Sequence, residues 1–335
     1  MENLSLCLRD LLLSEVEDDI STDLESISNL STRLREELRL YPMTREERFM
    51  NVAAADAGSQ VLQLASRRYG VMSALVYGAP SGSRFWMRPE SVSLPYTLSA
   101  GRFEGIVNVR REAKLYETAT AFLESKPETE LMIVDGPLVF SDWWRLAGCR
   151  KDQDRLLRAV NGLLRMGNKM GVALAGFVKR PSARYLLGSL GMEHETQLPD
   201  SYLLLHALNP GERTDVFSPS RGAERAGRPA PFMEEVELPI YCFYARTTRE
   251  WSIPPARVDV PISSLGRLDD ISDYCYATAV TNGIPLVVAR ADEGVKITRR
   301  FMAEVYGEAL ARMGRRTGEV RCLAPYWGEG GWMGA

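Results

Sequence analysis

Residues 131–140 read LMIVDGPLVF, an apolar run that ends in the pair Asp135-Gly136. Four consecutive apolar residues, Leu131 to Val134, are typical of a strand that is buried on both faces of a sheet. Similar runs precede and follow it in NVAAADAGSQ (51–60), YGVMSALVYG (69–78) and GVALAGFVKR (171–180). Residues 106–125 and 151–170, which lie between these runs, have the composition and spacing of helices. This alternation predicts an α/β fold in which helices cover a mixed sheet.

The remaining sequence predicts an arm, a loop and a tail around this core. Residues 2–40 carry apolar residues at helical spacing, and Ser and Asp residues around 19–22 can divide this arm into two helices. The arm either packs on its own domain or contacts a partner through a coiled-coil-like seam. We divide the chain into an N-terminal helical arm (1–45), a main domain (46–322) and a C-terminal tail (323–335).

The second half of the main domain has weaker signals. Residues 209–232 are rich in Pro, Gly and Ser and predict a long, mobile surface loop. Residues 241–246 have strand character. Residues 272–282 and 294–313 predict helices, and residues 283–290 between them predict a strand or an extended turn.

The composition excludes several classes of function. The chain has 335 residues, of which 45% are hydrophobic, and a net charge of −3, so contact with nucleic acid depends on a local basic patch. Five scattered cysteines, no signal peptide and no long apolar run predict a cytoplasmic protein without a membrane segment. There are two histidines, His194 and His206, which argues against a His-rich zinc site. Metal ligands are therefore expected to be carboxylates.

Carboxylates follow two of the predicted strands. Asp56 ends the run in AAADAGS, where Gly58 permits a tight turn, and Asp135 ends the run in MIVDGPL. An Asp at the carboxyl end of a buried strand faces a cleft, and the helix between the two strands carries Glu112 and Glu117. Three such carboxylates suit Mg²⁺ or Mn²⁺. The alternative is that each Asp-Gly pair is a turn and each Glu is a solvated helix residue.

Basic residues follow the third strand and precede the helix glutamates. Lys179, Arg180 and Arg184 are either a solvated helix start or contacts for phosphate groups beside a metal site. Arg110 and Arg111 extend such a path along the helix. Of these residues, Arg180, Arg184, Arg110 and Arg111 are the candidate DNA-binding residues.

Five stretches occur in an order that resembles the NurA nuclease family, whose members have an RNase H-like fold. They are DAGS (56–59), RREAKLYE (110–117), VDGPL (134–138), GFVKRPSARYL (176–186) and NGIPLVVAR (282–290). The resemblance covers residues 50–300. It implies an RNase H-like mixed sheet flanked by helices, so that the main domain would be a NurA-like nuclease domain.

Carried over position by position, the resemblance implies that Asp56, Glu117 and Asp135 hold Mn²⁺ or Mg²⁺. Lys179 would offset charge on the phosphate. Glu112 is the alternative to Glu117, and because the two lie five positions apart on a helix, only one of them is expected at the metal.

The late motif departs from the family pattern. Asn282 and Arg290 occupy the positions at which the family has a Tyr and a His. An arginine is always cationic and cannot bind a metal. Asp292 can supply an oxygen in its place, or Arg290 can hold a phosphate.

The resemblance also implies an activity and partners. It implies a DNA nuclease that trims ends from 5′ to 3′ and cleaves single strands, acting as a homodimer, cytoplasmic and nucleoid-associated, with a HerA-type hexameric ATPase in end resection and double-strand-break repair. The chain has no G-x-x-x-x-G-K-[ST] loop, so ATP-driven movement needs such a partner. Two alternatives stay open. One is a catalytically weakened interaction protein that regulates or caps the translocase, and the other is an enzyme for a small phosphorylated substrate.

Overall fold

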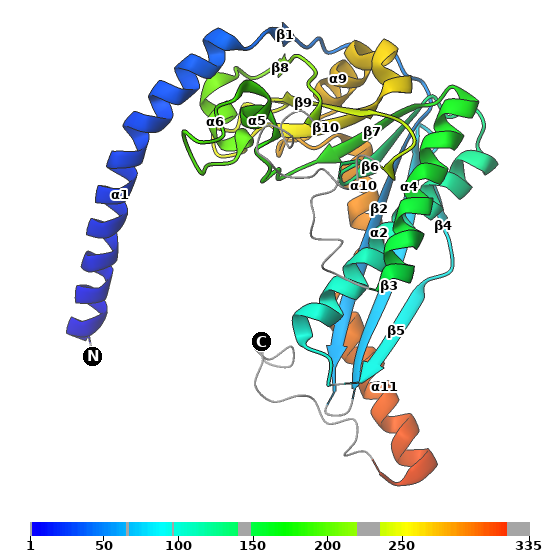
Figure 1. The fold of residues 1–335 in the computed structure, drawn as a ribbon. Helices are drawn as coiled ribbons and strands as arrows, with labels where there is room; N and C mark the ends of the chain where they lie inside the picture. The colour runs from blue at the N-terminus through cyan, green and yellow to red at the C-terminus, as the bar shows by residue number, and fades with distance from the viewer. Residues whose placement is uncertain (1, 65–66, 96, 140–148, 220–234, 320–335) are drawn as a thin grey trace.

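One mixed sheet organises the chain (Figure 1). The computed structural model describes residues 2–64, 67–95, 97–139, 149–219 and 235–319. Within these ranges ten strands form the sheet, in the order β1-β8-β9-β10-β7-β6-β2-β3-β4, with β5 also paired to β3. The strands are β1 (Leu40–Pro42), β2 (Val52–Gln63), β3 (Arg67–Ala79), β4 (Ser83–Trp86), β5 (Glu90–Pro95), β6 (Leu131–Asp135), β7 (Ala173–Val178), β8 (Glu212–Thr214), β9 (Ile240–Ala245) and β10 (Ala256–Pro261).

The apolar runs form the centre of the sheet. β2 is antiparallel to β3 and parallel to β6, and β6 is parallel to β7. Leu131 to Val134 of β6 are fully buried because helices cover both faces of the sheet there. The expected α/β fold, a mixed sheet flanked by helices, is confirmed.

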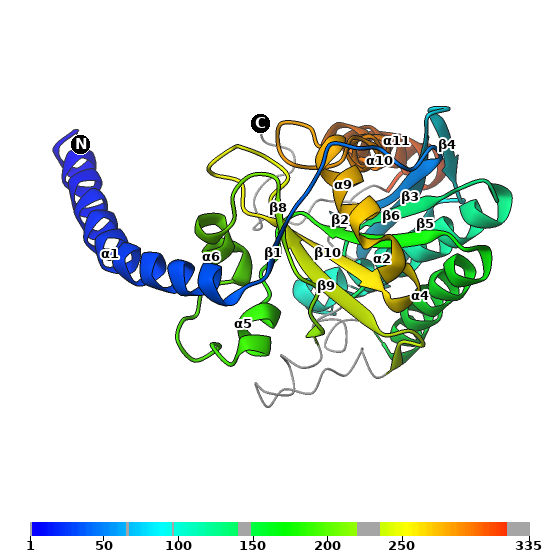
Figure 2. The same cartoon turned by 90° about the horizontal axis from the view of Figure 1, so that it is seen from above.

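Two helix layers bury the two faces (Figure 2). α2 (Ala100–Ser125) and α4 (Arg150–Met170) pack Tyr116 and Leu163 against one face. α9 (Leu268–Ala277) and α10 (Leu286–Val295) pack Tyr274 and Val288 against the other. Apart from the N-terminal helix, the other helical elements among the described residues are α5 (Tyr185–Leu190), α6 (Asp200–Ala207), the 3-10 helix η1 (Ile262–Arg267) and α11 (Arg299–Thr317). α11 lies along the far end of β2, where Met302 and Tyr306 contact Leu62 and Leu64.

The N-terminal arm is one continuous helix, α1 (Glu2–Glu37), and not two. Ile27, Leu30 and Leu34 near its carboxyl end are buried against α5 and α6. The other end of α1 extends away from the body (Figure 1). Leucines of this part, such as Leu12, are about half exposed. One end of the arm therefore packs on its own domain, and the other end leaves apolar side chains uncovered. Among the described residues, no helix combines the length and apolar composition needed to cross a membrane.

Three predicted elements differ from the structure. β2 continues through Asp56 and Gly58 to Gln63, because it pairs with β3 along its whole length. Residues 286–290, predicted as a strand or turn, begin α10, whose apolar residues recur at helical spacing on one buried face. The predicted loop 209–232 contains β8, of which Thr214 is fully buried. Residues 220–232 of that loop and the tail 323–335 lie outside the described residues.

Candidate metal centre

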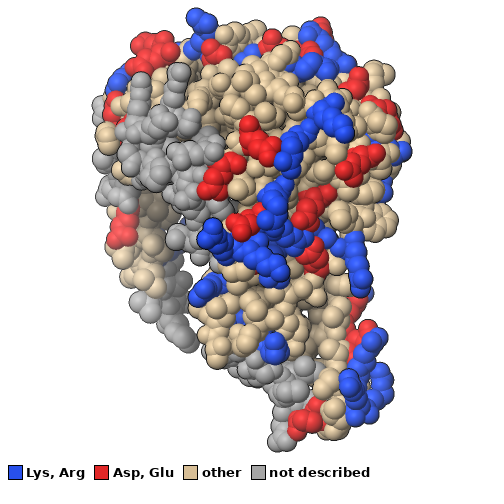
Figure 3. All heavy atoms as spheres, turned by 45° about the vertical axis from the view of Figure 1, so that its right-hand side comes forward, with Lys and Arg blue, Asp and Glu red and all other residues tan. Residues whose placement is uncertain are grey.

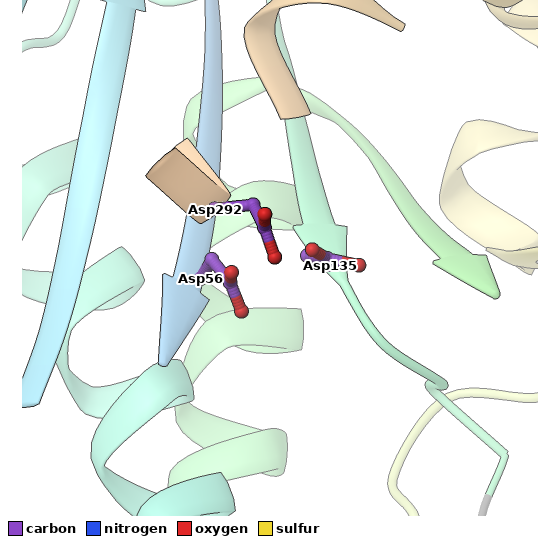
Figure 4. Close-up of side chains that lie close together, drawn as sticks. All are labelled: Asp56, Asp135 and Asp292. Atoms are coloured by element: carbon purple, nitrogen blue, oxygen red, sulfur yellow. The ribbon is translucent and has the colours of Figure 1, made fainter. Parts of the chain in front are cut away.

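Three aspartates from three separate elements come together beside the centre of the sheet. Asp56 lies within β2, Asp135 is the last residue of β6, and Asp292 lies in α10. One carboxylate oxygen of each lies within 4.8 Å of the others, and the three side chains converge on a common space (Figure 4). We call Asp56, Asp135 and Asp292 the aspartate cluster.

The strand register explains this convergence. β2 and β6 are parallel, and the pairing of Ala55 with Val134 makes Asp56 and Asp135 the next residues in line. Because side chains alternate across a strand, Asp56 points to the same face as Ala54, which packs against α10. Asp292 reaches the cluster from α10, which covers that face.

α10 approaches β2 closely enough to require a glycine. A Cβ atom at Gly58 would lie 2.7 Å from the carbonyl oxygen of Val295 at the end of α10. The role of Gly58 is therefore this close approach, and not the tight turn predicted from the sequence. Because Gly58 has no side chain, the end of α10 that carries Asp292 can lie this close to β2.

Lys179 completes the charge balance of the cluster. It follows β7, and its ammonium nitrogen lies 2.5 Å from Oδ2 of Asp135 and 3.5 Å from Oδ1 of Asp292. A second ammonium, on Lys296, lies 2.9 Å from Oδ2 of Asp292. The sequence did not single out Lys296, although its place four residues after Asp292 on a helix is a signal for such a pair.

Burial and mutual repulsion change how the aspartates ionise. Burial and the neighbouring charge of Asp135 raise the pKa of Asp56 to about 8. Burial also raises the pKa of Asp135, against the opposing charge of Lys179. Burial acts in the same direction on Asp292, but the hydrogen bond from Lys296 and the charge of Lys179 together lower its pKa. The metal-free cluster therefore keeps a proton on Asp56 near neutral pH.

Glu112 is the helix glutamate that faces the end of β6. Its residue surface is 7% exposed, and its Oε1 accepts a 2.5 Å hydrogen bond from Arg111. Its Oε2 is buried without a hydrogen-bond partner in the structure. An unsatisfied buried carboxylate oxygen is costly unless a cation or an ordered water completes it. The aspartate cluster, an all-carboxylate donor set, fits a hard divalent cation such as Mn²⁺ or Mg²⁺, and Glu112 is not one of the three residues whose oxygens lie within 4.8 Å of one another.

Glu117, the preferred ligand in the sequence analysis, is not brought to the aspartates. Its two oxygens accept hydrogen bonds of 2.7 and 2.6 Å from Arg155 of α4, which also binds Glu90. Five positions on a helix turn the side chain by well over a quarter of a turn, so Glu117 faces α4 while Glu112 faces β6. The geometry favours the alternative, Glu112.

The candidate DNA-binding arginines divide into engaged and exposed groups. Arg110 binds Asp152 of α4 at 2.8 Å, and Arg184 donates to backbone carbonyls of Glu193 and Thr196. Arg111 is half-buried beside Glu112. Arg180 is exposed, and Arg290 is half exposed in an ion pair with Glu293. Of the candidate DNA-binding residues, the placement of Arg180, Arg290 and Arg111 therefore agrees best with contacts to phosphate groups.

The face shown in Figure 3 has no broad basic area among the described residues. There Lys and Arg side chains form a narrow band across the middle, with Asp and Glu on both sides of it. This mixture agrees with the net charge of −3. Contact with a phosphate backbone on this face would rest on a strip of side chains and not on the whole surface.

Comparison with known proteins relates the fold to one family. The family model described as the NurA domain matches residues 50–297. The crystal structure of the NurA nuclease from Sulfolobus solfataricus is similar at a TM-score of 0.64 and 13% identity, with 90% of this chain and 96% of that chain covered. No curated protein matches.

Two further crystal structures have the same fold. A structure of NurA with manganese has a TM-score of 0.56 and 12% identity, and covers 88% of this chain and 98% of that chain. A structure of NurA bound to dAMP and manganese has the same TM-score, identity and coverage of this chain, and 96% of that chain is covered.

Proposed function

Because the chain belongs to the NurA family, we propose that it is a metal-dependent DNA nuclease that hydrolyses phosphodiester bonds. Solved proteins of this fold include one named as a nuclease, one with manganese, and one with both dAMP and manganese. Manganese takes oxygen ligands, and dAMP is a DNA nucleotide. We propose Mn²⁺, or Mg²⁺ in its place, as the cofactor and DNA as the substrate.

The observation that carries this proposal is the crowding of carboxylate oxygens around one point, beside a further carboxylate oxygen that is buried without a partner. Asp56, Asp135 and Asp292 crowd their oxygens within 4.8 Å, and the buried Oε2 of Glu112 has no partner in the structure. We propose that the aspartate cluster holds the cation and that Glu112 joins it from α2. When bound, such a cation polarises water and phosphate oxygens.

The other residues of the site are proposed to handle charge. Lys179 neutralises Asp135 in the metal-free protein and is close enough to the cluster to offset charge on a phosphate. Arg111 adds positive charge beside Glu112. Arg180 and Arg290, whose side chains reach solvent, would bind phosphates farther along the DNA backbone.

A digestion of end-labelled single-stranded DNA with Mn²⁺ tests this function. We expect the unsubstituted protein to degrade the DNA and Asp56→Ala to lose the activity. Asp154→Ala, which removes an exposed carboxylate of α4, is the matched control and should retain it. Absence of cleavage by the unsubstituted protein, with chelator and Mg²⁺ arms included, contradicts the proposal.

The finer parts of the proposed function concern polarity and partners. We propose 5′-to-3′ trimming and single-strand cleavage, with a homodimer that works beside a HerA-type hexameric ATPase in DNA end resection and double-strand-break repair. The uncovered apolar side chains of α1, such as Leu12 and Leu13, support a contact with another chain. Sedimentation of the full chain and of its Leu12→Glu variant tests the homodimer. A monomeric unsubstituted protein contradicts it.

A second candidate function is a weakened family member that regulates or caps the translocase. The half-exposed Arg290 favours it, because this residue replaces the family's His and binds Glu293. The digestion experiment separates the two candidates. An inactive protein that still binds the ATPase supports the regulator.

A further inference from the structure

A buried carboxylate anchors the backbone that follows Asp135. Asp259 lies in β10 and is fully buried, and its Oδ2 accepts hydrogen bonds from the backbone nitrogens of Leu138 (2.9 Å) and Val139 (3.1 Å). β10 is separated from β6 by β7 in the sheet. The segment 136–139, which leaves β6 at Asp135, is therefore tied to a strand two places away.

Asp259 is held in turn by a buried cation. Arg257, two residues earlier on the same face of β10, donates to its Oδ1 at 2.7 Å and to its Oδ2 at 3.1 Å. The Cys242 thiol also donates to Oδ1, at 3.1 Å. A buried ion pair of this kind is weak evidence of stabilisation, because taking both charges out of water is costly. The two hydrogen bonds that Asp259 accepts from backbone N–H groups indicate a role in fixing the segment 136–139.

The strand between β6 and β10 leaves room for this segment. Gly176 of β7 pairs with Val134 on one side and with Asp259 on the other. A Cβ atom at Gly176 would lie 2.8 Å from the carbonyl oxygen of Gly136 and 3.0 Å from the nitrogen of Leu138. The segment therefore crosses directly over Gly176 to reach Asp259.

We propose that Asp259, charge-balanced by Arg257, is a positioning residue for Asp135. The proposal rests on the proposed function, in which Asp135 binds the cation. Asp135 is the last residue of β6, so the direction of its side chain depends on the backbone that follows it. Gly176 supplies the space for that backbone and Asp259 supplies its two acceptor contacts, and together they hold Asp135 toward the aspartate cluster.

Two substitutions disturb the segment from different sides. Asp259→Asn keeps the size of the side chain but leaves one oxygen in place of two and removes the charge that balances Arg257. Gly176→Ala introduces a methyl group under Gly136 and Leu138 and leaves Asp259 unchanged. Gly167→Ala is the matched control, because its methyl group would crowd Leu174, also in β7, without touching the segment.

Binding of Mn²⁺ to the full-length protein, measured from the electron paramagnetic resonance signal of the free ion, is the first readout. We expect Asp259→Asn and Gly176→Ala to weaken Mn²⁺ binding by about tenfold, as loss of an outer contact to a metal ligand does in other proteins. Gly167→Ala should bind Mn²⁺ as the unsubstituted protein does. Hydrogen exchange of the backbone amides of Gly136, Leu138 and Val139 in a chelator is the second readout, and the first two variants should exchange these amides faster.

The outcomes separate this proposal from the function on which it rests. If the unsubstituted protein binds no Mn²⁺, the proposed function fails and the positioning role fails with it. If it binds Mn²⁺ and Gly176→Ala binds equally well with faster exchange, the positioning role alone is overturned. Because Gly176→Ala leaves the Asp259–Arg257 pair intact, the test remains decisive even where Asp259→Asn does not fold.

Discussion

The ammonium nitrogen of Lys179 lies 2.5 Å from Oδ2 of Asp135, where the parallel strands β6 and β7 end side by side. Asp135 pairs with Phe177 in the ladder, so Lys179, two residues on, projects to the same face as Phe177. The chain thus carries its own cation at the position where the metal ion is proposed to bind. A divalent cation that binds Asp135 must compete with this ammonium group.

Lys179→Met should therefore have opposite effects on metal binding and on catalysis. Without the competing ammonium group, we expect Mn²⁺ to bind several times more tightly. We expect kcat for DNA cleavage to fall by about 100-fold, the usual loss when one group that stabilises developing charge is removed. The measurements are a Mn²⁺ titration and single-turnover cleavage, with Lys151→Met on the exposed face of α4 as the control. A parallel loss of metal affinity and kcat contradicts the competition.

Stability and metal binding should depend on pH through Asp56. Its pKa is raised to about 8 in the folded protein, above its value in an unfolded chain, so the native state holds the extra proton between these two values. The free energy of unfolding of the metal-free protein should therefore fall as the pH rises toward 8. Because Mn²⁺ displaces this proton, its affinity should rise over the same range.

Thermal denaturation in a chelator between pH 5 and 9 measures the first effect. The variant Asp56→Asn lacks the titrating group and should have a flatter pH dependence of its melting temperature. Equal slopes for the two proteins would mean that Asp56 is ionised throughout the range, contrary to the effect of burial beside Asp135.

The two glutamates of α2 should separate cleanly by mutation. Glu112→Gln should weaken Mn²⁺ binding by at least about tenfold, because the orphaned Oε2 is proposed to complete the cation site. Glu117→Gln should leave Mn²⁺ binding unchanged and cost about 1 kcal/mol or less of stability, since its partner Arg155 keeps Glu90 and the pair is partly exposed. Metal titration and thermal denaturation of both variants decide the matter, and the reverse pattern would restore Glu117 as the ligand.

The close approach of α10 to β2 should be sensitive to one methyl group. Gly58→Ala would set its Cβ against the carbonyl oxygen of Val295 and push away the end of α10 that carries Asp292. We expect a loss of about 1–3 kcal/mol in the free energy of unfolding and weaker Mn²⁺ binding. Gly101→Ala, where a methyl group meets open space, is the control. Unchanged Mn²⁺ binding by a destabilised Gly58→Ala would show that Asp292 is not needed at the cation.

The centre of the sheet was predictable because burial on both faces leaves a continuous apolar signal. LMIVD and ALAGFV could be recognised as strands without knowledge of their neighbours. The far half of β2 could not, because Ala57, Gly58 and Ser59 are small or polar and resemble a turn. Only the pairing with β3, a contact with a later part of the chain, makes them a strand.

The types of residue in the candidate site were predictable from the sequence, but which carboxylates come together there was less so. Asp56 and Asp135 follow from the apolar runs that carry them. The sequence left Glu112 and Glu117 as alternatives, because the phase of a helix relative to a sheet is set by packing against α4 and not by local spacing. Asp292 was named only as a substitute, because the position of the expected late ligand holds Arg290, which cannot bind a metal.

The unequal lengths of β2 and β6 give the sheet a stepped edge. The ladder between them stops at Ala55 and Val134, while β2 continues beside β3 to Gln63 (Figure 1). The aspartate cluster lies in the inner corner of this step, beside the part of β2 and β3 that extends past the end of β6. Under the proposed function, a DNA strand that lies against this extension would meet the carboxylates at a fixed distance along its backbone. The position of the cut would then be set by the shape of the sheet edge and not by recognition of a base.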